Sequence, residues 1–320
     1  MYEFIDVNGR STDIEQDLMS GLKSEPKSIP GYFIYDRRGS ELFERICNLP
    51  EYYLTRTELK IIENSAQEII EPYKEHDTVV ELGSGNLFKT ELLLKTFLQY
   101  RRNLNFFPVD ISGEVLRESS SKLYEARPGI NVTALCGEYF DCLHYLRRFG
   151  RKKVVLWLGS SIGNFSKDRA IGFLRILKRA LRKNDGLLIG IDLKKDPLTV
   201  EKAYNDRAGV TSDYHLNVLH RLNREFGADF KVDKFYHRSF YDPDRGAVEA
   251  FIISRCDQQV RIKGLDLTVH FREDEKVFNE LSCKYDLAEI ERLAEQSGFS
   301  LKGRWLDENE DFILAMFNAF

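Results

Sequence analysis

The sequence predicts an α/β protein with a doubly wound, mostly parallel sheet and a second, discontinuous α+β unit. Between about residues 77 and 195, β-rich runs that end in glycine turns alternate with segments of helical spacing, which is typical of βαβ units. The runs are almost continuously apolar, as strands covered on both faces must be. After Asp192 the alternation stops and hairpin-like segments follow, which indicates the second unit.

The alternating region is expected to contain five parallel strands with helices between them. Ser112 and Ser166 stand where two of these helices would begin, and their hydroxyls can accept backbone N–H groups as N-caps. The expected strands are 78–85, 105–110, 131–137, 153–159 and 186–192, and the expected helices are 89–100, 113–126 and 166–183.

The pattern of the later half is that of an α+β unit. Residues 239–254 are expected to form a hairpin, because Asp-Pro-Asp-Arg-Gly is turn chemistry between two β-rich runs. The other expected elements are a helix at 213–226, strand regions at 259–271 and 277–285, a helix at 287–299 and a strand at 311–320.

We therefore expect two discontinuous domains. A Rossmann-like core would contain residues 58–195 and 284–320, and a substrate-binding domain would contain residues 1–57 and 196–283. A ligand would bind between them, outside the carboxyl ends of the strands.

Composition and charge narrow the class of protein. The chain has 320 residues and a formal net charge of −4, which disfavours nucleic acid as a partner. Its five cysteines show no C-x-x-C spacing, so neither a zinc site nor a disulfide framework is expected. The sequence has no apolar run long enough to span a membrane and no signal-peptide pattern at its start. These features predict a soluble, cytoplasmic protein without a metal or a membrane partner. A monomer is expected, although no feature of the sequence bears on the oligomeric state.

The first candidate motif is VVELGSGN, in which an acidic residue and two glycines follow a strand. Gly83 and Gly85 permit a sharp turn and a close approach of the backbone to a ligand. A dinucleotide site would need a third glycine where the chain has Phe88, which disfavours NAD or FAD. Glu81, two residues before the first glycine, instead resembles the first motif of S-adenosylmethionine methyltransferases. A structural turn explains this motif alone about as well.

Two further strand ends offer polar side chains. Asp110 ends the second strand and is placed to bond ribose hydroxyls, although an N-cap for the next helix is the alternative. Glu138 and Tyr139 follow the third strand, where an acidic–aromatic pair can hold an adenine ring by a hydrogen bond and stacking. An ordinary loop is the alternative for this pair.

The segment WLGSSIGNF follows the fourth strand, where methyl-accepting substrates lie in this fold class. It contains Gly159, Gly163 and Asn164, and the amide of Asn164 offers two donors and an acceptor. An Asn-containing turn is the competing interpretation.

An unusual number of aromatic residues lies near the N-terminus, in YFIYDRRGSELF and LPEYYLTRTE. These side chains can form the walls of a pocket and present hydroxyls to a ligand. Packing of the segment onto the core is an equally good explanation. The residues concerned are Tyr35, Phe43, Tyr52 and Tyr53.

The strand VFNELSCKY places a carboxylate beside a hydroxyl. Alternate side chains of a strand share a face, so Glu280 and Ser282 point one way while Leu281 and Cys283 point the other. Taken alone, the strand favours a solvated sheet face. The functional alternative is a site that grips a polar or cationic ligand.

Taken together, the motifs resemble the histidine-specific methyltransferase family, whose best-known members trimethylate the α-amino group of L-histidine in ergothioneine biosynthesis. The resemblance covers the chain from about residue 30 to its end and implies a class I methyltransferase core. It also implies S-adenosylmethionine as methyl donor and no metal. The segments that carry it, in order, are YDRRGSELFERICNLPEYYLTRTE, ELGSGNLFKT, PVDIS, WLGSSIGN, YNDRAGVT with NVLHRLNREFGADF, and NELSCKY.

The resemblance assigns roles to individual residues. Positions around the methyl donor are matched by Gly83, Gly85, Lys89, Asp110, Glu138, Tyr139 and Gly159. Asn164 and Tyr204 match residues that hold the carboxylate and α-amine of the amino acid, and with Tyr52 they would orient the amine. The aromatic walls are matched by Tyr35, Phe43 and either Tyr52 or Tyr53, and the imidazole-binding pair by Glu280 and Ser282.

One departure from the family pattern concerns the choice of substrate. Ala250 stands where histidine-specific members often have a larger methionine, so the site is enlarged. Related fungal members that methylate a prenylated tryptophan lack the acid at the position of Glu280, which favours histidine here. Leu54 replaces a commoner proline and Asn86 a commoner threonine, with no functional change expected.

We therefore expect an enzyme that methylates L-histidine to hercynine, the first step towards ergothioneine. The same chemistry on another amino acid or amine, such as tryptophan, is the alternative. A non-catalytic nucleotide-binding module is a more remote one.

Overall fold

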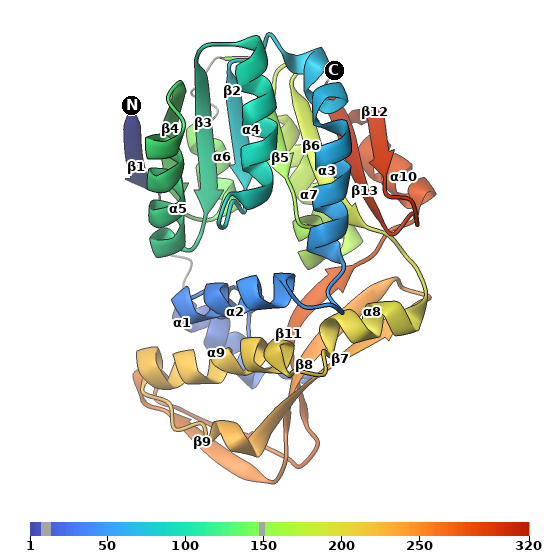
Figure 1. Cartoon of the computed structure of the whole chain (residues 1–320). Helices are drawn as coiled ribbons and strands as arrows, with labels where there is room; N and C mark the ends of the chain where they lie inside the picture. The colour runs from blue at the N-terminus through green and yellow to red at the C-terminus, as the bar shows by residue number, and fades with distance from the viewer. Residues whose placement is uncertain (8–13, 147–150, 320) are drawn as a thin grey trace. The chain divides into compact units, whose positions relative to one another are not determined.

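The computed structural model describes residues 1–7, 14–146 and 151–319 (Figure 1). The chain divides into two compact units, each built from separate stretches of sequence. The first unit contains Met1–Gly9, Leu54–Lys194 and Cys283–Phe320, and the second contains Arg10–Tyr53 and Lys195–Ser282.

An eight-stranded sheet forms the centre of the first unit, in the order β1-β4-β3-β2-β5-β6-β13-β12. Strands β1 to β6 pair in parallel, whereas β13 pairs antiparallel with both β6 and β12. The predicted doubly wound, mostly parallel sheet is therefore confirmed. The strands are β1 (Tyr2–Asp6), β2 (Thr78–Leu82), β3 (Leu104–Asp110), β4 (Ile130–Cys136), β5 (Lys153–Trp157), β6 (Gly186–Asp192), β12 (Phe299–Leu306) and β13 (Phe312–Ala319).

The order of these strands fixes where a ligand can bind. The chain winds outward from β2 through β3 to β4 on one side and from β5 to β6 on the other, so its direction reverses between β2 and β5. In open α/β sheets, ligands bind at such a switch point, outside the carboxyl ends of the strands. The segments after β2 and β5 are therefore the places to look for a site in this unit.

Helices cover both faces of this sheet, with α3, α4 and α5 on one face and α6, α7 and α10 on the other (Figure 1). Ser166 accepts a bond from the N–H of Arg169 as the predicted N-cap of α7. Asp286 and Glu289 form a capping box at the start of α10. The helical segments are α3 (Leu54–Ile70), η2 (Glu71–Tyr73), α4 (Phe88–Tyr100), α5 (Gly113–Ala126), α6 (Tyr139–Leu146), η3 (Ser161–Asn164), α7 (Lys167–Lys178) and α10 (Leu287–Ser297).

Two expectations differ from the structure of this unit. Residues 1–57 were assigned to the second domain, but Tyr2–Asp6 forms edge strand β1 beside β4, with Tyr2 opposite Val132. A five-residue strand without a following glycine turn gives little signal of its own. Ser112 occupies the N-cap position of α5, yet its side chain makes no capping bond. The Asp110 carboxylate accepts the Ser112 N–H instead (2.9 Å).

The second unit contains a three-stranded sheet in the order β11-β8-β7 and a separate hairpin of β9 and β10. The predicted hairpin of residues 239–254 is present as β7 and β8. The region 259–271, expected as one strand, forms β9 and β10, joined by a 3₁₀ turn. The strands are β7 (Phe235–Asp242), β8 (Ala247–Ser254), β9 (Gln258–Ile262), β10 (Leu267–Phe271) and β11 (Lys276–Cys283), which enters the first unit at its last residue.

Helices and 3₁₀ turns complete the second unit. Helix α9 packs against both β7 and α2. Its buried residues recur at helical spacing, as the predicted amphipathic pattern requires. The helical segments are α1 (Ile14–Lys23), η1 (Gly31–Ile34), α2 (Arg37–Cys47), α8 (Pro197–Tyr204), α9 (Val210–Phe226), η4 (Val232–Lys234) and η5 (Lys263–Leu265).

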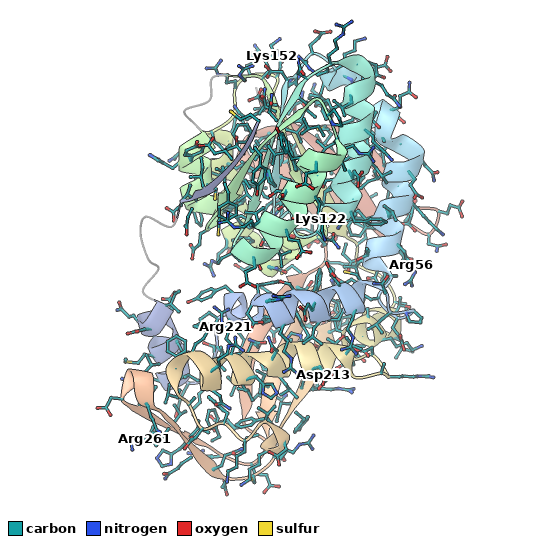
Figure 2. The ribbon with its side chains drawn as sticks, turned by 60° about the vertical axis from the view of Figure 1, so that its left-hand side comes forward. Arg56, Lys122, Lys152, Asp213, Arg221 and Arg261 are labelled. Atoms are coloured by element: carbon teal, nitrogen blue, oxygen red, sulfur yellow. The ribbon has the colours of Figure 1, made fainter. Side chains whose placement is uncertain are left out.

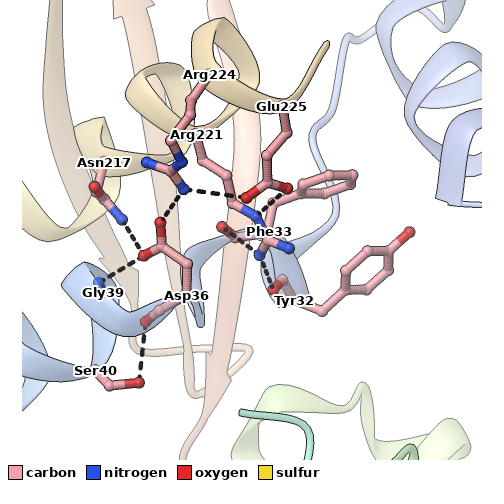
Figure 3. A network of polar contacts seen from close by, with 9 residues as sticks. All are labelled: Tyr32, Phe33, Asp36, Gly39, Ser40, Asn217, Arg221, Arg224 and Glu225. Atoms are coloured by element: carbon pink, nitrogen blue, oxygen red, sulfur yellow. Dashed lines mark hydrogen bonds and ion pairs between the residues drawn. The ribbon is translucent and has the colours of Figure 1, made fainter. Parts of the chain in front are cut away.

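A carboxylate at the start of α2 holds that helix to α9 (Figure 3). Asp36 accepts bonds from the Gly39 N–H (2.7 Å) and the Asn217 amide (2.7 Å), and it pairs with Arg224 (2.6 Å). Burial by itself would raise the pKa of Asp36, but these hydrogen bonds outweigh it and hold the pKa below its ordinary value. The network fixes the segment that carries Tyr35 and Phe43.

Charged side chains lie over the surfaces of both units (Figure 2). Lys122 on α5, for example, is exposed and pairs with Glu118 one helical turn away (2.6 Å). Exposed pairs of this kind contribute at most about 1 kcal/mol. Across the described ranges, no helix has the length and apolar character needed to span a bilayer.

Candidate functional site

The turn after β2 in the first unit is held by backbone bonds to the neighbouring strand. The N–H groups of Gly83 and Ser84 both donate to the Val109 carbonyl on β3 (2.9 and 3.0 Å). Gly83 and Gly85 have φ angles of 71° and 51°, a left-handed conformation that glycine adopts readily. The predicted glycine turn therefore lies at the switch point of the sheet.

Asp110, at the end of β3, joins this turn to the next helix. One carboxylate oxygen accepts the Gly85 N–H (2.9 Å) and the other accepts the Ser112 N–H (2.9 Å). Burial raises the pKa of Asp110, while these backbone donors oppose the shift. Each oxygen retains a second lone pair for a ligand hydroxyl, so the ribose and capping interpretations are compatible.

Tyr139 closes the other side of the glycine turn. A Cβ added to Gly83 would lie only 2.7 Å from the Tyr139 hydroxyl, so no side chain fits at position 83 without a shift. The Tyr139 ring contacts the buried rings of Trp157 (6.1 Å) and Phe173 (5.7 Å), which fix its position. Burial raises the pKa of its hydroxyl. Glu138, the other member of the predicted adenine pair, is half-buried directly before α6.

The turn after β5 is bonded by a buried carboxylate to which the sequence motifs assigned no role. Glu58, on α3, has no exposed surface. It accepts the Gly159 N–H with both oxygens (2.8 and 3.0 Å) and pairs with Lys89 (2.5 Å). A signal was present in the sequence, because Glu58 is four residues after Leu54 and three before Ile61, on the apolar face of a helix.

The polar groups at these two turns gather in one place. The nearest atom to a Cβ added at Gly159 would be the Lys89 ammonium (3.1 Å), and Gly159 has a φ of 73°. The Ser161 hydroxyl lies 3.9 Å from the Cβ position of Gly83 and 3.8 Å from that of Gly159. At its switch point, the first unit thus presents an ammonium, hydroxyl groups and a carboxylate. The glycine turns there also leave the backbone open to close approach by a ligand.

Glu81, the acidic residue of the first motif, lies inside β2 and not at this surface. Its buried carboxyl accepts a hydrogen bond from the Thr90 hydroxyl on α4. Burial raises the pKa of Glu81 to about 8, so the group is mostly protonated at neutral pH. Its contact joins α4 to the strand beneath it.

A closed set of side chains in the second unit, here called the aromatic cluster, contains most residues predicted to bind the amino acid. The Tyr35 hydroxyl donates to Glu280 Oε1 (3.3 Å), and the Tyr204 hydroxyl is hydrogen-bonded to Ser282 Oγ (2.9 Å). Contacts between neighbouring rings link these residues. The ring centroids are separated by 6.4 Å for Tyr35–Tyr214, 5.9 Å for Tyr214–Phe43, 6.3 Å for Phe43–Tyr52 and 6.3 Å for Tyr52–Tyr204.

The aromatic cluster brings α2, α8, α9 and β11 together around one carboxylate and one hydroxyl. Glu280 and Ser282 lie on the same strand, as the two-residue spacing predicted, and both have partners in the cluster. Tyr214, which the sequence reasoning did not select, is buried on α9, and burial raises the pKa of its hydroxyl well above the ordinary value. The arrangement offers aromatic surface, hydroxyl groups and one acid to a small ligand.

Two stacked histidines lie behind Glu280. The rings of His215 and His237 are 4.3 Å apart and nearly parallel, at 6°. His215 Nδ1 is hydrogen-bonded to the side-chain oxygen Oδ1 of Asn279 (2.9 Å), and its Nε2 is 3.8 Å from Glu280 Oε2. Burial lowers the pKa of His215 to about 4 and that of His237 to about 2. Both rings are neutral at pH 7, so Glu280 faces an uncharged imidazole here.

The two adjacent tyrosines near residue 52 have different surroundings. Tyr52 contacts Phe43 and Tyr204 within the aromatic cluster. Tyr53 instead accepts a hydrogen bond from Lys195 Nζ (2.7 Å), which also lies 4.4 Å from the centre of its ring. The geometry therefore favours Tyr52 as the substrate-facing residue of the predicted pair.

Two other predicted residues lie elsewhere. Ala250, on β8, is buried and stands opposite Ser239 of β7 in the sheet register. Asn164 is exposed at the end of η3 and belongs to the first unit. The structure thus brings Tyr52 and Tyr204 into contact within one unit, while Asn164 belongs to the other.

No group of three metal-binding side chains was found within residues 1–7, 14–146 and 151–319. The site residues that are described are instead carboxylates, hydroxyls, aromatic rings and one ammonium. These groups suit an organic ligand with hydroxyl and charged groups.

Comparison with known proteins gives the same family along almost the whole chain. Residues 14–319 match the model of the family described as "Histidine-specific methyltransferase, SAM-dependent". The chain is 37% identical to the histidine N-alpha-methyltransferase of Mycolicibacterium smegmatis over 98% of this chain and 97% of the relative. It is 38% identical to the Mycobacterium tuberculosis protein of the same name, over 95% and 94%. Ergothioneine biosynthesis protein 1 of Neurospora crassa is 33% identical over 90% of this chain, which spans 33% of that protein.

Proposed function

The chain belongs to the histidine-specific, S-adenosylmethionine-dependent methyltransferase family, and we propose that it trimethylates the α-amino group of L-histidine to hercynine. The observation that carries this proposal is the aromatic cluster, which surrounds a carboxylate and a hydroxyl on one strand. The bacterial relatives are named histidine N-alpha-methyltransferases, which supports the same substrate. The product would be the first intermediate on the route to ergothioneine.

The first unit is proposed to hold the methyl donor. S-adenosylmethionine carries an adenosine, an amino-acid zwitterion and a sulfonium that supplies the methyl group. Asp110 would accept the ribose hydroxyls, and Glu138 with Tyr139 would flank the adenine. The ammonium of Lys89 and the glycine turns at Gly83 and Gly159 suit the charged end of the donor. The residues present therefore fit this donor.

The second unit is proposed to hold the amino acid. Glu280 would accept the imidazole N–H and Ser282 would bond the other ring nitrogen. Because Glu280 faces a neutral His215, a ligand N–H would add favourable charge-assisted hydrogen bonding to this carboxylate. Tyr35 and Phe43 would line the imidazole, and Tyr52 and Tyr204 would contact the α-amine and carboxylate.

The chemical requirement is a neutral amine aligned with the methyl group. In-line displacement needs nitrogen within about 3–3.5 Å of the methyl carbon, so positioning supplies much of the rate. The α-amine is mostly protonated at pH 7 and must lose a proton to expose its lone pair. Desolvation lowers an amine pKa, and the proton can leave through tyrosine hydroxyls or water. Tyr52 and Tyr204 are the proposed orienting groups, and the assignment of Asn164 to the amine rests on the family resemblance.

A second candidate is the same reaction on a larger amine, such as tryptophan. Its support is Ala250, which is small and buried on the sheet that also contains β11. Its obstacle is the pair Glu280 and Ser282, because an indole offers one N–H for the carboxylate but no ring acceptor for the Ser282 hydroxyl. Histidine is therefore the preferred substrate.

We also propose that the enzyme acts as a cytoplasmic monomer without nucleic acid. The net charge of −4 supports the last point, since nucleic-acid binding surfaces are basic. Light scattering of the purified protein at several concentrations tests whether it is a monomer. A mass that rises with concentration would contradict the monomer.

The proposed function is tested by incubating the purified chain with S-adenosylmethionine and L-histidine. We expect S-adenosylhomocysteine to form together with histidine that has gained up to three methyl groups. Fragmentation in the mass spectrometer should place every added methyl on the α-nitrogen. Methylation of an imidazole nitrogen, or no gain of mass on histidine, would contradict the proposal.

A further inference from the structure

Glu58 is a buried charge at the donor site to which none of the sequence motifs assigned a role. A carboxylate without exposed surface must be compensated, because removing it from water is costly. Among the described residues, Glu58 pairs with the Lys89 ammonium (2.5 Å) and accepts the Gly159 N–H with both oxygens (2.8 and 3.0 Å). Both of these residues are among the proposed contacts of the methyl donor.

The surrounding fold makes room for this carboxylate. A Cβ added to Gly190, on β6, would lie 2.0 Å from Glu58 Oε1, so even alanine would displace the group. The φ angle of Gly190 is not positive, so the backbone conformation does not require glycine there. The close approach of Glu58 explains why position 190 has no side chain. Helix α3, helix α4, the turn after β5 and strand β6 all meet at one carboxylate.

We propose that Glu58 is a positioning residue for the methyl donor: it fixes the Lys89 ammonium and the Gly159 turn in the geometry that receives S-adenosylmethionine. This inference rests on the proposed function. Glu58 does not itself contact the donor in this account. It acts because an ammonium on a flexible side chain loses rotational freedom when one of its donors is held, and because both Glu58 oxygens orient the Gly159 peptide.

The other end of β5 provides a matched control. Asp185 is also buried, accepts a backbone N–H at each oxygen, from Lys153 (3.0 Å) and Arg182 (2.9 Å), and pairs with the Lys153 side chain (3.3 Å). Lys153 starts β5, whereas Gly159 follows its end. Two similar buried carboxylates thus hold opposite ends of one strand, and only Glu58 holds residues assigned to the donor.

The first test compares Glu58→Gln with Asp185→Asn in the full chain. Each amide has the shape of the carboxylate that it replaces but carries no charge. The partner lysine therefore loses its counter-charge, and each variant is expected to have a lower melting temperature. For E58Q we expect the Kd and KM for S-adenosylmethionine to rise about tenfold or more, with the Kd for L-histidine unchanged. D185N should leave both unchanged below its melting temperature. Equal donor affinity in E58Q and wild type would overturn the inference.

A second pair of variants separates position from charge. Gly190→Ala retains every charge but displaces the carboxylate, so it should also weaken donor binding. In a double-mutant cycle, E58Q and Lys89→Met should be clearly non-additive on donor affinity if Glu58 acts through Lys89. Additive losses would overturn that route. A wild-type chain that binds no donor would overturn the proposed function, whereas donor binding that is equal in wild type, E58Q and G190A would overturn only this inference.

Discussion

The two proposed binding regions are built from different materials. In the first unit, carboxylates bind backbone: Asp110 holds the N–H groups of Gly85 and Ser112, and Glu58 holds that of Gly159. In the second unit, side chains bind side chains. There Tyr35 bonds Glu280 across 245 positions of sequence, and the aromatic cluster is completed by rings. A donor common to many enzymes would then be matched by backbone geometry, whereas the choice of amino acid would depend on replaceable side chains.

This difference predicts separable effects. Substitutions in the backbone-built region should change the KM for S-adenosylmethionine and leave histidine binding alone. Substitutions in the aromatic cluster should do the reverse.

Removal of the acid in the aromatic cluster should have the largest effect. For Glu280→Ala we expect kcat/KM for histidine to fall about a thousandfold, because the half-buried carboxylate proposed to bond the imidazole is lost. The KM for S-adenosylmethionine should stay within about twofold of the wild-type value, since the proposed donor-binding region of the first unit is unchanged. Steady-state kinetics with each substrate varied in turn provides the measurement.

Glu280→Gln is the matched variant for this experiment, because it keeps the shape and one acceptor oxygen. It should lie between wild type and E280A. If E280A methylated histidine as fast as wild type, the assigned role of Glu280 would be wrong.

In the backbone-built region, Gly83→Ala should come next. The new Cβ would lie 2.7 Å from the Tyr139 hydroxyl and the residue would retain a φ of 71°, so the turn must shift. We expect the KM for S-adenosylmethionine to rise about thirtyfold, with histidine affinity preserved. The double variant G83A/Tyr139→Phe lacks the clashing hydroxyl and should recover part of the loss. No recovery would show that steric contact with Tyr139 is not the cause.

The two adjacent tyrosines offer a sharper comparison within the second unit. Tyr52→Phe removes a hydroxyl from the aromatic cluster and should lower kcat/KM for histidine about tenfold, the value of one polar contact. Tyr53→Phe removes the hydroxyl that accepts the bond from Lys195 and should change the same quantity less than twofold. The reverse ranking would place Tyr53 at the substrate instead.

Filling the space at position 250 should change selectivity more than rate. Ala250→Met adds volume at a buried position of β8. We expect kcat/KM for histidine to change by no more than about threefold, while any activity on tryptophan falls further. Competition between the two amino acids measures the ratio directly. An increase in tryptophan turnover would show that Ala250 does not border the substrate.

The stacked histidines of the second unit should make the stability of the fold depend on pH. His215 and His237 have folded pKa values of about 4 and about 2, against 6.5 for an ordinary histidine. Below pH 6.5 the unfolded chain therefore binds more protons than the folded one. The free energy of unfolding should fall on acidification, by about 1.4 kcal/mol per pH unit for each histidine between pH 6.5 and 4.

Urea unfolding at several pH values tests this slope. His237→Gln removes one of the two histidines and should reduce the slope by about 1.4 kcal/mol per pH unit. Equal slopes in H237Q and wild type would contradict the burial argument.

The sequence was sufficient for the features that depend on local pattern. The strand ends, the glycine turn at Gly83 and the acid at Asp110 follow from short motifs whose geometry is set within a few residues. Glu280 and Ser282 could be paired because alternation along a strand is also local.

The features that could not be predicted from the sequence depend on contacts between distant segments. Glu58 meets Gly159 across 101 positions, and its role could be suspected only from a charge on an apolar helix face. Tyr214 and His215 belong to the site because α9 packs on β7 and α2, which no local pattern specifies. Strand β1 is recognisable only by its partner β4.

The most direct test of the account is a competition assay with the wild-type chain. Equal concentrations of L-histidine, L-tryptophan and L-phenylalanine compete for limiting S-adenosylmethionine, and mass spectrometry follows the methyl gain of each. We expect methylated histidine to accumulate almost alone, with trimethylated histidine as the end product. Tryptophan or phenylalanine methylated at a rate comparable to histidine would contradict it.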